Sequence, residues 1–575
     1  MASPSTIDQI LTVLNTANHA EHDYFQAIRI LVTKRNESPV NSAEYEGLQK
    51  KINSVYAKIE DEIKTNRNPP LTPIKFGTSG WRGIIGKDIN IYTVRLVTRA
   101  IAQIYLDLQH NQELAEALGT TDLDEARRRG AVVGHDNRFG GPLFAQAACD
   151  VLTSLGFTVH FAGESTTGAL SAAVLELGAA FSINLTPSHN PLEYAGFKYN
   201  AADGGPAAPI LTSRITELAL AFLEREVQFE PTPEPALVRQ CDPLALWFSL
   251  FKKNKGRHGL DIDDIMTRLA SHDDLILAVD CLHGASRIHI DRLLAGMPQK
   301  AVVKIRTTAD VTFGGVAPEP SPANMGSVNA ALQRHPHRLK IGVVMDPDGD
   351  RIRFSDGTTE IDMNAFGAMA YHFLHEGKGK KGMVAKTVAT SNMANSLAAA
   401  FGEEVFEPKV GFKEFKPVID KALVCFEESD GITVIGHTPE KDAYIGLMLA
   451  LDMVLSRNEN LGDYYRELAR QFGAFFPAKD GVVVSQQGHA LQSSLDGLKK
   501  YRPGDSLKIG ATERSISQVI DIDGLKLVFD DKSWLLIRPS GTEPKVRFYV
   551  EARTAQGKED LFMSARHMLA DIGLL

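Results

Sequence analysis

The stretch Ala180-Phe-Ser-Ile-Asn-Leu-Thr-Pro-Ser188-His-Asn-Pro191 passes from an apolar segment directly into a stiff polar loop. Its apolar half predicts a short buried strand, and its two prolines end that strand. The chain before it alternates in the same way between predicted strands and helices, at residues 131–134, 144–155, 157–161 and 170–177. Because strands alternate with helices, we expect a mainly parallel sheet with right-handed crossovers.

The same rhythm returns twice along the chain, before a C-terminal part of different texture. The later strands are predicted at 275–279, 341–345, 383–385 and 423–426, with helices after residue 391 and at 443–456. In the C-terminal part, residues 516–529 form an apolar pattern around Asp523-Gly524, which is a strong hairpin signal. The predicted fold class is therefore α/β, with three mixed, mainly parallel α/β domains and a C-terminal α+β domain.

Residues 1–65 predict an N-terminal helical extension. Apolar residues recur at helical spacing at 7–14 and 48–63, and Asn41 with Glu44 indicates a cap for the second helix. The linker at 66–73, with three prolines, then stops helix formation. The expected division is the extension at 1–65, α/β domains at 66–235, 236–360 and 361–478, and the α+β domain at 479–575.

The composition is that of a soluble multidomain protein. The 575 residues include 62 Lys and Arg against 71 Asp and Glu, a net charge of −9, and 43% are hydrophobic. A mildly acidic chain argues against nucleic-acid or anionic-membrane partners, although a local basic pocket for a small anion is compatible with it. The longest apolar-rich run, at 444–455, is too short to span a bilayer.

The cysteines and the first residues predict a cytoplasmic location. The four cysteines lie far apart without a Cys-x-x-Cys pair, at Cys149, Cys241, Cys281 and Cys425. This spacing favours buried thiols in a reducing compartment over a disulfide framework or a zinc site. Residues 1–8 show no basic region followed by an apolar stretch, so no secretory signal is expected.

The loop at 186–191 presents a serine hydroxyl directly after a predicted strand. Ligands of α/β proteins bind at the loops that leave the carboxyl ends of strands. Lys198 follows closely and supplies a cation that could lie near a phosphorylated Ser188. A plain turn would use the same residue types, so this loop alone leaves a structural and a functional interpretation equally open.

The loop Asp346-Pro-Asp348-Gly-Asp350-Arg351 follows the strand predicted at 341–345. Three carboxylates at alternate positions of a tight turn repel one another unless a cation lies between them, and hard oxygen ligands suit Mg²⁺. A calcium-binding EF-hand loop is the alternative. It is disfavoured because Arg351 and Gly357 stand where that loop needs its glycine and its glutamate, and because a strand precedes the motif.

A third loop, Arg538-Pro-Ser540-Gly541-Thr542-Glu-Pro544-Lys545, combines an arginine, two hydroxyls and exposed backbone N–H groups, which favours phosphate binding. Two less specific segments could each be an ordinary turn or strand end: Phe76-Gly-Thr-Ser-Gly-Trp-Arg82-Gly83 and Phe426-Glu427-Glu-Ser429. Three further basic residues are, taken alone, compatible with plain surface charges: Arg351, Lys386 and Lys413. No P-loop motif and no Gly-x-Ser-x-Gly motif occurs in the chain.

Taken together and in order, these five segments resemble the motifs of the α-D-phosphohexomutase superfamily, and within it those of bacterial phosphoglucomutases. The segments that resemble its N-terminal signature, phosphoserine loop, metal loop, sugar loop and phosphate loop begin at Phe76, Thr186, Asp346, Glu427 and Arg538. The match spans about residues 74–575. The resemblance implies four domains around a central cleft and an isomerase-class intramolecular phosphotransferase that acts on a small phosphosugar.

The resemblance also implies a role for each matching residue. Ser188 would carry the catalytic phosphoryl group, and Asp346, Asp348 and Asp350 would hold one Mg²⁺ against it, with Ser188 as a further ligand. Arg82 and Lys198 would neutralise the phosphoserine, and Lys413 would be a candidate general acid or base. The remaining residues would bind substrate: Arg351, Lys386, Glu427, Ser429, Arg538, Ser540, Gly541 and Thr542.

By the same resemblance, the reaction interconverts glucose 1-phosphate and glucose 6-phosphate through phospho-Ser188 and glucose 1,6-bisphosphate, which also serves as activator. The bisphosphate would turn end for end in the cleft, and closure of the last domain would exclude water. The only partner expected is the phosphosugar, with no nucleic acid and no membrane, and the chain is expected to be a monomer or a homodimer.

Departures from the family pattern leave the sugar open. Trp81 stands where phosphoglucomutases of this kind often carry histidine, and the sugar loop continues unusually as Asp430-Gly-Ile-Thr-Val-Ile-Gly-His437. Gly204-Gly-Pro-Ala207 and Glu440-Lys-Asp442 favour glucose, because both resemble the bacterial phosphoglucomutase pattern. The alternatives are a mutase for mannose, glucosamine or pentose phosphates, a sugar-bisphosphate synthase, and a non-enzymatic sugar-phosphate binding regulator.

Overall fold

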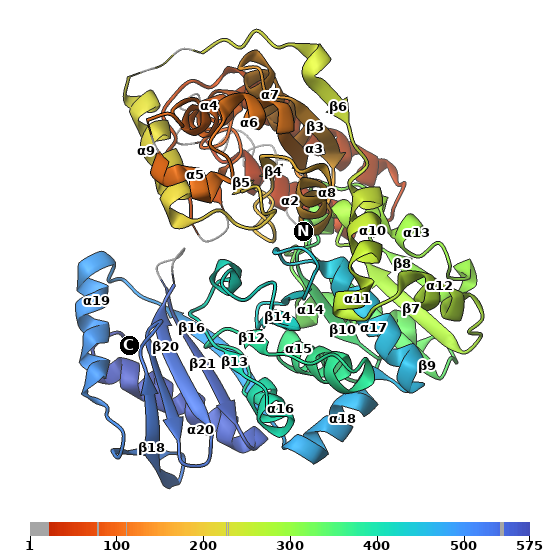
Figure 1. Cartoon of the computed structure of the whole chain (residues 1–575), viewed down its shortest axis with the longest axis vertical. Helices are drawn as coiled ribbons and strands as arrows, with labels where there is room; N and C mark the ends of the chain where they lie inside the picture. The colour runs from red at the N-terminus through yellow and green to blue at the C-terminus, as the bar shows by residue number, and fades with distance from the viewer. Residues whose placement is uncertain (1–21, 78–79, 111, 226, 228, 541–544) are drawn as a thin grey trace.

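The computed structural model describes residues 22–77, 80–110, 112–225, 227, 229–540 and 545–575, arranged as a helix pair and four domains (Figure 1). The first domain forms the upper lobe of Figure 1 and the last domain the lower left, with the two middle domains between them. The expected three α/β domains and C-terminal α+β domain are confirmed. Within the described residues, no helix is both long and apolar enough to cross a membrane.

The N-terminal pair consists of α2 (Tyr24–Glu37) and α3 (Ala43–Thr65). The predicted cap of α3 is wrong by one residue. The Ser42 side chain accepts the backbone N–H of Tyr45, whereas Asn41 turns the chain with a φ of 66°. Apolar side chains on both helices are buried in one core with the first domain. The helical segment expected at 7–14 lies outside the described residues.

The first domain is built on a six-stranded sheet in the order β1-β5-β4-β2-β3-β6. Four of its strands are parallel, while β5 runs antiparallel beside β4 and brings Lys198 opposite Asn184. The elements are β1 (Trp81–Ile84), α4 (Ile91–Leu106), α5 (Gln112–Leu118), α6 (Leu123–Arg129), β2 (Ala131–His135), α7 (Gly141–Ser154), β3 (Val159–Glu164), α8 (Thr167–Leu177), β4 (Phe181–Leu185), β5 (Tyr194–Asn200), α9 (Pro209–Glu224) and β6 (Val238–Gln240).

The second domain has a five-stranded sheet in the order β11-β10-β9-β7-β8. The strands β8, β7 and β9 are parallel. Residues 346–351, called the Asp loop below, make the tight turn from β9 into the antiparallel β10. The elements are α10 (Pro243–Lys253), α11 (Lys255–His258), α12 (Ile262–Ala270), β7 (Leu275–Asp280), α13 (Ile290–Leu293), β8 (Val302–Ile305), η4 (Phe313–Gly315), α14 (Pro322–Gln333), β9 (Leu339–Met345), β10 (Ile352–Ser355) and β11 (Glu360–Ile361).

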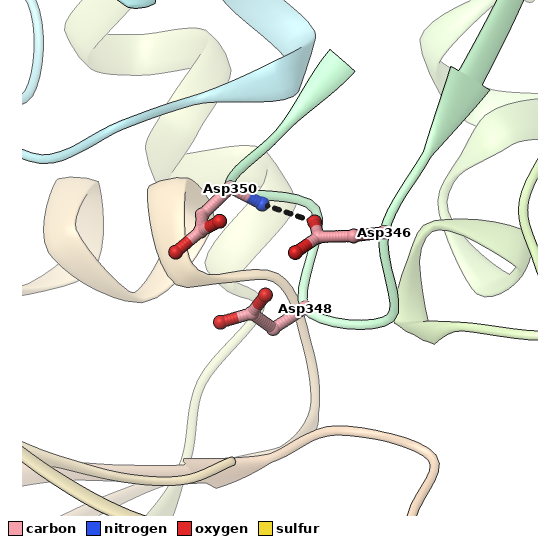
Figure 2. Close-up of side chains that lie close together, drawn as sticks. All are labelled: Asp346, Asp348 and Asp350. Carbon is pink, nitrogen blue, oxygen red and sulfur yellow. Dashed lines mark hydrogen bonds between the residues drawn. The ribbon is translucent and has the colours of Figure 1, made fainter. Parts of the chain in front are cut away.

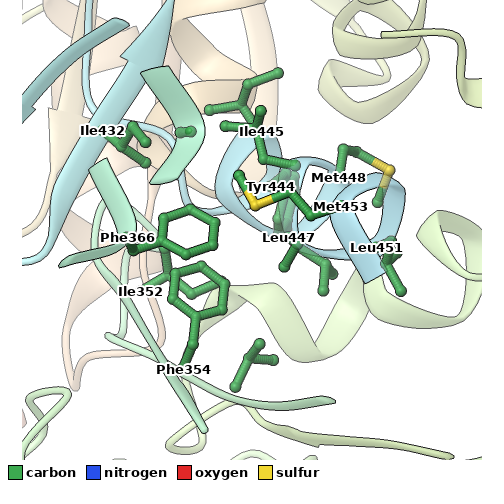
Figure 3. Packing of buried hydrophobic residues seen from close by; sticks show 14 of the residues in the cluster. Ile352, Phe354, Phe366, Ile432, Tyr444, Ile445, Leu447, Met448, Leu451 and Met453 are labelled. Atoms are coloured by element: carbon green, nitrogen blue, oxygen red, sulfur yellow. The ribbon is translucent and has the colours of Figure 1, made fainter. Parts of the chain in front are cut away.

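The third domain shares its hydrophobic core with the second. The rings of Phe354 and Phe366 are stacked, with centroids 3.8 Å apart. Figure 3 shows them near Ile432 and the apolar side chains of α17. The four-stranded sheet has the order β13-β12-β14-β15. The elements are α15 (Met363–His372), η5 (Phe373–Gly377), β12 (Val384–Lys386), α16 (Met393–Phe401), β13 (Val405–Phe406), η6 (Phe412–Phe415), β14 (Val424–Glu427), β15 (Gly431–Val434), α17 (Ala443–Arg457) and α18 (Leu461–Phe472).

The last domain is a six-stranded antiparallel sheet in the order β16-β21-β20-β19-β18-β17. The predicted hairpin around Asp523-Gly524 is present between β18 and β19. A separate buried cluster, which includes Val388, Trp534 and Tyr549, joins this sheet to the third domain. The elements are β16 (Phe476–Val483), α19 (Gly488–Asp496), β17 (Ser506–Ile509), β18 (Thr512–Ile520), β19 (Leu525–Phe529), β20 (Trp534–Pro539), β21 (Lys545–Ala552) and α20 (Ala555–Asp571).

Three of the predicted domain boundaries lie close to, or inside, an edge strand of a sheet. β6 pairs with β3 of the first sheet, β11 straddles the boundary at 360/361, and β16 straddles the boundary at 478/479. Edge strands of this kind are defined by pairing with distant partners, which a local hydrophobic pattern does not reveal. The four cysteines, all within the described residues, are free thiols, three buried and Cys241 partly exposed.

Candidate active site

Ser188 lies in the loop after β4 and is almost fully buried, with 1% of its surface exposed. Its backbone has a φ of 62°, a left-handed conformation that is uncommon for serine and that must be held by its surroundings. The Ser188 N–H donates to Thr186 Oγ1 at 2.9 Å, and the Ser188 hydroxyl donates to Asp346 Oδ2 at 2.7 Å. The loop therefore aims the serine hydroxyl at the Asp loop of the second domain.

Arg138 lies on the loop between β2 and α7. Its side chain binds the backbone of residues 186–194, called the serine loop below. One terminal nitrogen of its buried guanidinium donates to the carbonyl oxygens of Pro191 (2.7 Å) and Tyr194 (3.3 Å). The other donates to those of Ser188 (2.7 Å) and Asn190 (2.5 Å). A rigid fork that binds four carbonyl groups fixes the path of the whole loop. Nothing in the sequence around Arg138 had indicated this role.

Close packing of β5 beneath the serine loop explains the glycine at position 196. A Cβ atom on Gly196 would lie 2.2 Å from the carbonyl oxygen of Thr186 and 2.6 Å from the backbone of Pro187. Any side chain there would push the loop away from the sheet. Two residues further along β5, on the same face of the strand, Lys198 extends into the site.

Asp346, Asp348 and Asp350 come together as the sequence predicted (Figure 2). All three are buried, and one ligand oxygen from each lies within 4.8 Å of the others. The backbone N–H groups of Asp350 and Arg351 donate to Asp346 Oδ1 at 3.0 and 3.1 Å, which fixes the turn. Among the described residues, Asp348 Oδ1 is buried without a hydrogen-bond partner.

Two lysines offset part of the charge of this triad. Lys198 Nζ lies 2.7 Å from Asp348 Oδ2 and 3.1 Å from Asp350 Oδ2, and Lys441 Nζ lies 3.3 Å from Asp350 Oδ2. Burial raises the pKa of Asp346 well above its usual range, and the charges of Asp348 and Asp350 raise it further. Burial acts in the same direction on Asp350, but Lys198 and Lys441 outweigh it and hold the pKa of Asp350 well below its usual range.

The triad fits a small divalent cation. Three carboxylates face two ammonium groups, one carboxylate oxygen is buried without a partner, and every donor is a hard oxygen atom. Oxygen donors of this kind match Mg²⁺ better than a softer metal. The acidic triad expected from the sequence is thus able to hold a metal, with Ser188 adjacent to it.

Two arginines lie over the same cluster. Burial lowers the pKa of Arg82, on β1, and the nearby Arg351 lowers it further, while Asp350 opposes both. Burial also disfavours the charge of Arg351, but Asp350 and Asp346 outweigh it and raise the pKa of Arg351. In both residues Nε is buried and lacks a hydrogen-bond partner within the part of the chain that the structure describes. These unsatisfied donors beside a serine hydroxyl are suited to an oxyanion.

The loop at the end of β14, which begins at Glu427 and resembles the sugar loop of the superfamily, contacts the same cluster from the third domain. Ser429 Oγ donates to Glu427 Oε1 at 2.7 Å, and Lys441 Nζ lies 3.8 Å from the same oxygen while also contacting Asp350. A β-bridge joins Arg351 to Gly431. Lys441 thus links the sugar loop to the Asp loop, a role that its segment Glu440-Lys-Asp442 did not reveal in the sequence.

The contacts given for Lys386, Arg538 and Ser540 among the described residues do not involve the triad. Lys386 is fully buried, and its ammonium contacts Glu407, Thr390 O and Asn392 Oδ1, so its expected substrate contact stays a prediction. Lys413, in η6, is partly exposed and makes no ion pair with the described residues. Arg538 pairs with Asp523, and the Ser540 N–H donates to Lys545 O. Gly541 and Thr542 lie outside the described residues.

Most of the chain matches the sequence profiles of known protein domains. Four sequence profiles described as phosphoglucomutase/phosphomannomutase match the chain: alpha/beta/alpha domains I, II and III at residues 73–225, 262–359 and 362–472, and the C-terminal domain at 494–567. The chain belongs to the phosphoglucomutase/phosphomannomutase family. It is accordingly an enzyme of the isomerase class, an intramolecular phosphotransferase of the phosphohexomutase superfamily, as the resemblance in its sequence implied.

Individual relatives in this mutase family differ in the sugar they are named for. The chain is 27% identical to the phosphoglucomutase/phosphomannomutase of Thermococcus kodakarensis, over 84% of this chain and 95% of that protein. It is 25% identical to the phosphoglucomutase of Staphylococcus saprophyticus, over 83% and 90%. A solved structure of a putative phosphomannomutase from Thermus thermophilus aligns with a TM-score of 0.67 and 26% identity, over 87% and 99%.

Proposed function

We propose that this mutase interconverts glucose 1-phosphate and glucose 6-phosphate, with Ser188 as the phosphoryl carrier. The observation that carries the proposal is the 2.7 Å hydrogen bond from Ser188 Oγ to Asp346 Oδ2, inside a buried cluster of three carboxylates. A hydroxyl in a site with unsatisfied cationic donors is suited to accept and return a phosphoryl group.

Each half-reaction needs positioning and charge stabilisation rather than a wide choice of reactive groups. A magnesium ion held by Asp346, Asp348 and Asp350 would draw charge from the phosphoryl group as it transfers. Arg82 and Lys198 stabilise the charge on the phosphoserine oxygens. Arg138 holds Ser188 in position by binding its backbone carbonyl oxygen.

The sugar must be read in two orientations, because the phosphate returned to Ser188 differs from the phosphate that Ser188 gave. Glu427 and Ser429 hydrogen-bond sugar hydroxyls in both orientations, together with Arg351. Arg538 and Ser540, with Gly541 and Thr542, hold the phosphate that is not reacting. Glucose 1,6-bisphosphate is the intermediate that turns, and Lys413, whose ammonium lacks an ion pair within the described residues, is the candidate general acid or base.

Two observations support glucose over other sugars. The segments Gly204-Gly-Pro-Ala207 and Glu440-Lys-Asp442 resemble the bacterial phosphoglucomutase pattern, and the similar protein from Staphylococcus saprophyticus carries the phosphoglucomutase name. A mannose-phosphate mutase is the second candidate, because other relatives of similar identity are named phosphomannomutase. We expect the enzyme to act in the cytoplasm, as a monomer or homodimer, and its four free thiols are compatible with a reducing compartment.

The test is a substrate panel with the purified protein, Mg²⁺ and a trace of glucose 1,6-bisphosphate. The 1-phosphates of glucose, mannose, glucosamine and a pentose are compared by kcat/KM. We expect glucose to exceed the others by about tenfold or more, a difference of about 1.4 kcal/mol in transition-state binding. A higher value for mannose would reassign the sugar, and no turnover of any sugar would refute the proposal.

A further inference from the structure

The N-terminal pair α2 and α3 lies outside the matched family domains, yet it contacts the residues that hold the serine loop. Its apolar side chains share one core with the first domain, which explains why the pair is ordered but gives it no part in the reaction. Three specific contacts go further, and all three surround Arg138. They involve η4 of the second domain, the start of α7, and the far end of the serine loop.

The first contact supports the aromatic ring under Arg138. Asn36, at the end of α2, donates from Nδ2 to the carbonyl oxygen of Gly314 at 2.9 Å. Its amide cannot turn freely, because Asn36 Oδ1 accepts two hydrogen bonds from Arg35 at 3.1 and 3.2 Å. The neighbouring Phe313 places its ring 4.9 Å from the guanidinium carbon of Arg138, within cation–π range.

The second contact holds the residues that follow Arg138. The ring of Tyr56, on α3, packs against that of Phe139, with centroids 4.5 Å apart. One residue later, a Cβ on Gly140 would lie 2.9 Å from Ile63 Cδ1, so α3 approaches the backbone itself. The segment that carries Arg138 is therefore packed directly against α3.

The third contact lies at the far end of the serine loop. Arg29, on α2, forms an ion pair with Glu193. The next residue, Tyr194, offers its carbonyl oxygen to Arg138. Helix α2 thus contacts the serine loop at Glu193, after Ser188 in the chain. Helix α3 contacts the segment that carries Arg138, the residue that binds the carbonyl groups of the loop.

We propose that α2 and α3 form a brace that positions the phosphoserine loop, acting through Arg138 and Glu193 as positioning residues. This inference rests on the proposed role of Ser188 in phosphoryl transfer. The Ser188 backbone has a left-handed conformation, and Arg138, which lies outside the serine loop, binds its carbonyl oxygen. A small displacement of a reacting atom lowers the rate of transfer steeply. Loosening the brace should therefore lower kcat and leave the affinity for substrate nearly unchanged, because none of these side chains touches the sugar loop.

The experiment uses full-length protein with Arg29→Glu, Glu193→Arg and the reversed pair that combines both. Lys64→Glu is the matched control, since Lys64 is an exposed α3 residue whose ion-pair partner, Glu60, is also on α3 and away from the loop. We expect each single variant to lower kcat about tenfold with KM within about twofold, and the reversed pair to recover most of the loss. Asn36→Ala, which removes the support of η4, should lower kcat in the same way and decides the matter if a charge variant does not fold.

The melting temperature of each variant shows how far the substitution destabilises the protein, and kcat shows whether it also displaces the reacting serine. If the single variants keep the wild-type kcat, with or without a lower Tm, the brace is refuted. A fall in kcat that the reversed pair does not recover, or an equal fall in Lys64→Glu, refutes it as well. An inactive wild-type protein would instead refute the proposed function, so the two failures are distinguishable.

Discussion

The hydroxyl of Ser188 donates to a carboxylate oxygen of Asp346 over 2.7 Å, although the two residues are 158 positions apart and belong to different domains. Contacts between these domains maintain the hydrogen bond. Arg287 binds both oxygens of Glu164 at 2.8 Å, and the backbone N–H of Thr167 donates to Asp348 O at 2.8 Å. The candidate site is therefore a product of domain packing, and it exists only where the first two domains are docked.

Replacing Ser188 with alanine removes the proposed carrier. Ser188→Ala should lower mutase turnover by at least about a thousandfold, because no other hydroxyl contacts Asp346 Oδ2 within the described residues. The measurement is turnover with glucose 1-phosphate, together with the mass of the chain after incubation with glucose 1,6-bisphosphate. The wild-type chain should gain one phosphoryl group and the variant none. A variant that retains activity would mean that another residue accepts the group.

Asp348→Asn tests the metal assignment. The variant removes one of three carboxylates and the oxygen that is buried without a partner, so Mg²⁺ affinity should fall about tenfold or more. Calorimetric titration with Mg²⁺ measures this directly, and turnover should fall in parallel. The control is Asp463→Asn, an exposed carboxylate on α18 whose partner is a surface arginine. Equal Mg²⁺ affinity in Asp348→Asn and the wild type would contradict the assignment.

Arg138→Lys keeps the charge but loses the fork. A lysine ammonium cannot reach the four carbonyl groups that the two terminal guanidinium nitrogens bind. We expect kcat to fall about tenfold to a hundredfold, with a smaller change in KM. Crystal structures of the two proteins should then differ in the path of residues 186–194. An unchanged kcat would show that the loop holds its shape without Arg138.

Residues close in the sequence were predictable, and those set by distant contacts were not. The three aspartates stand at alternate positions of one turn after a strand, so their clustering follows from local geometry alone. Arg138 acts on carbonyl groups about 50 positions away, and a lone arginine after a strand carries no signal for that. Lys386 is another case, because its ion pair with Glu407 depends on the packing of the third domain, which a lysine at a strand end does not reveal, and its expected role near substrate stays a prediction. The prediction of the α3 cap was wrong by one residue, because Asn41 and Ser42 are both good capping residues and only the backbone conformation decides between them.

Two glycines offer a matched test of the packing under the serine loop. In Gly196→Ala the new methyl group would lie 2.2 Å from Thr186 O, so the loop must move, and we expect at least about 2 kcal/mol of destabilisation with loss of turnover. In Gly326→Ala, inside α14, no atom lies within 4 Å and alanine is the better helix former. That variant should gain about 0.5–1 kcal/mol. Urea unfolding measures both, and equal stability of the two variants would contradict the close approach at position 196.

The ion-pair cluster between the third and last domains predicts a pH dependence of stability. Burial alone would raise the pKa of Glu407, but the ion pairs with Lys386 and Lys526, at 2.9 and 2.8 Å, outweigh it and lower the pKa to about 2. Burial and the charge of Lys386 lower the pKa of Lys526 to about 8, although Glu407 opposes them. Lys526 also lies over the Trp534 ring, so the cluster forms part of the contact that joins the two domains.

The two shifts act in different pH windows. An unfolded glutamate titrates near pH 4.5, so the stability that Glu407 contributes is complete above that pH and is lost as the pH falls towards 2. For Lys526 the unfolded chain holds the proton up to about pH 10.5 and the native chain only up to about 8, so this residue makes the protein more stable as the pH rises between those values. Removing Glu407 should therefore remove the acid transition and leave an uncompensated pair of buried lysines.

Glu407→Gln should consequently lower the free energy of unfolding by roughly 3 kcal/mol at neutral pH, and by less as the pH approaches 3. The measurement is urea unfolding of variant and wild type at pH 7, 4.5 and 3. Unfolding is monitored by tryptophan fluorescence, to which Trp534 contributes. Glu513→Gln, an exposed substitution on β18 of the last domain, is the control for a charge change as such. The two stability curves should converge in acid, because the wild type loses the ion pairs that the variant never had. Curves that stay parallel from pH 7 to 3 would show that Glu407 keeps an ordinary pKa and that packing alone joins the two domains.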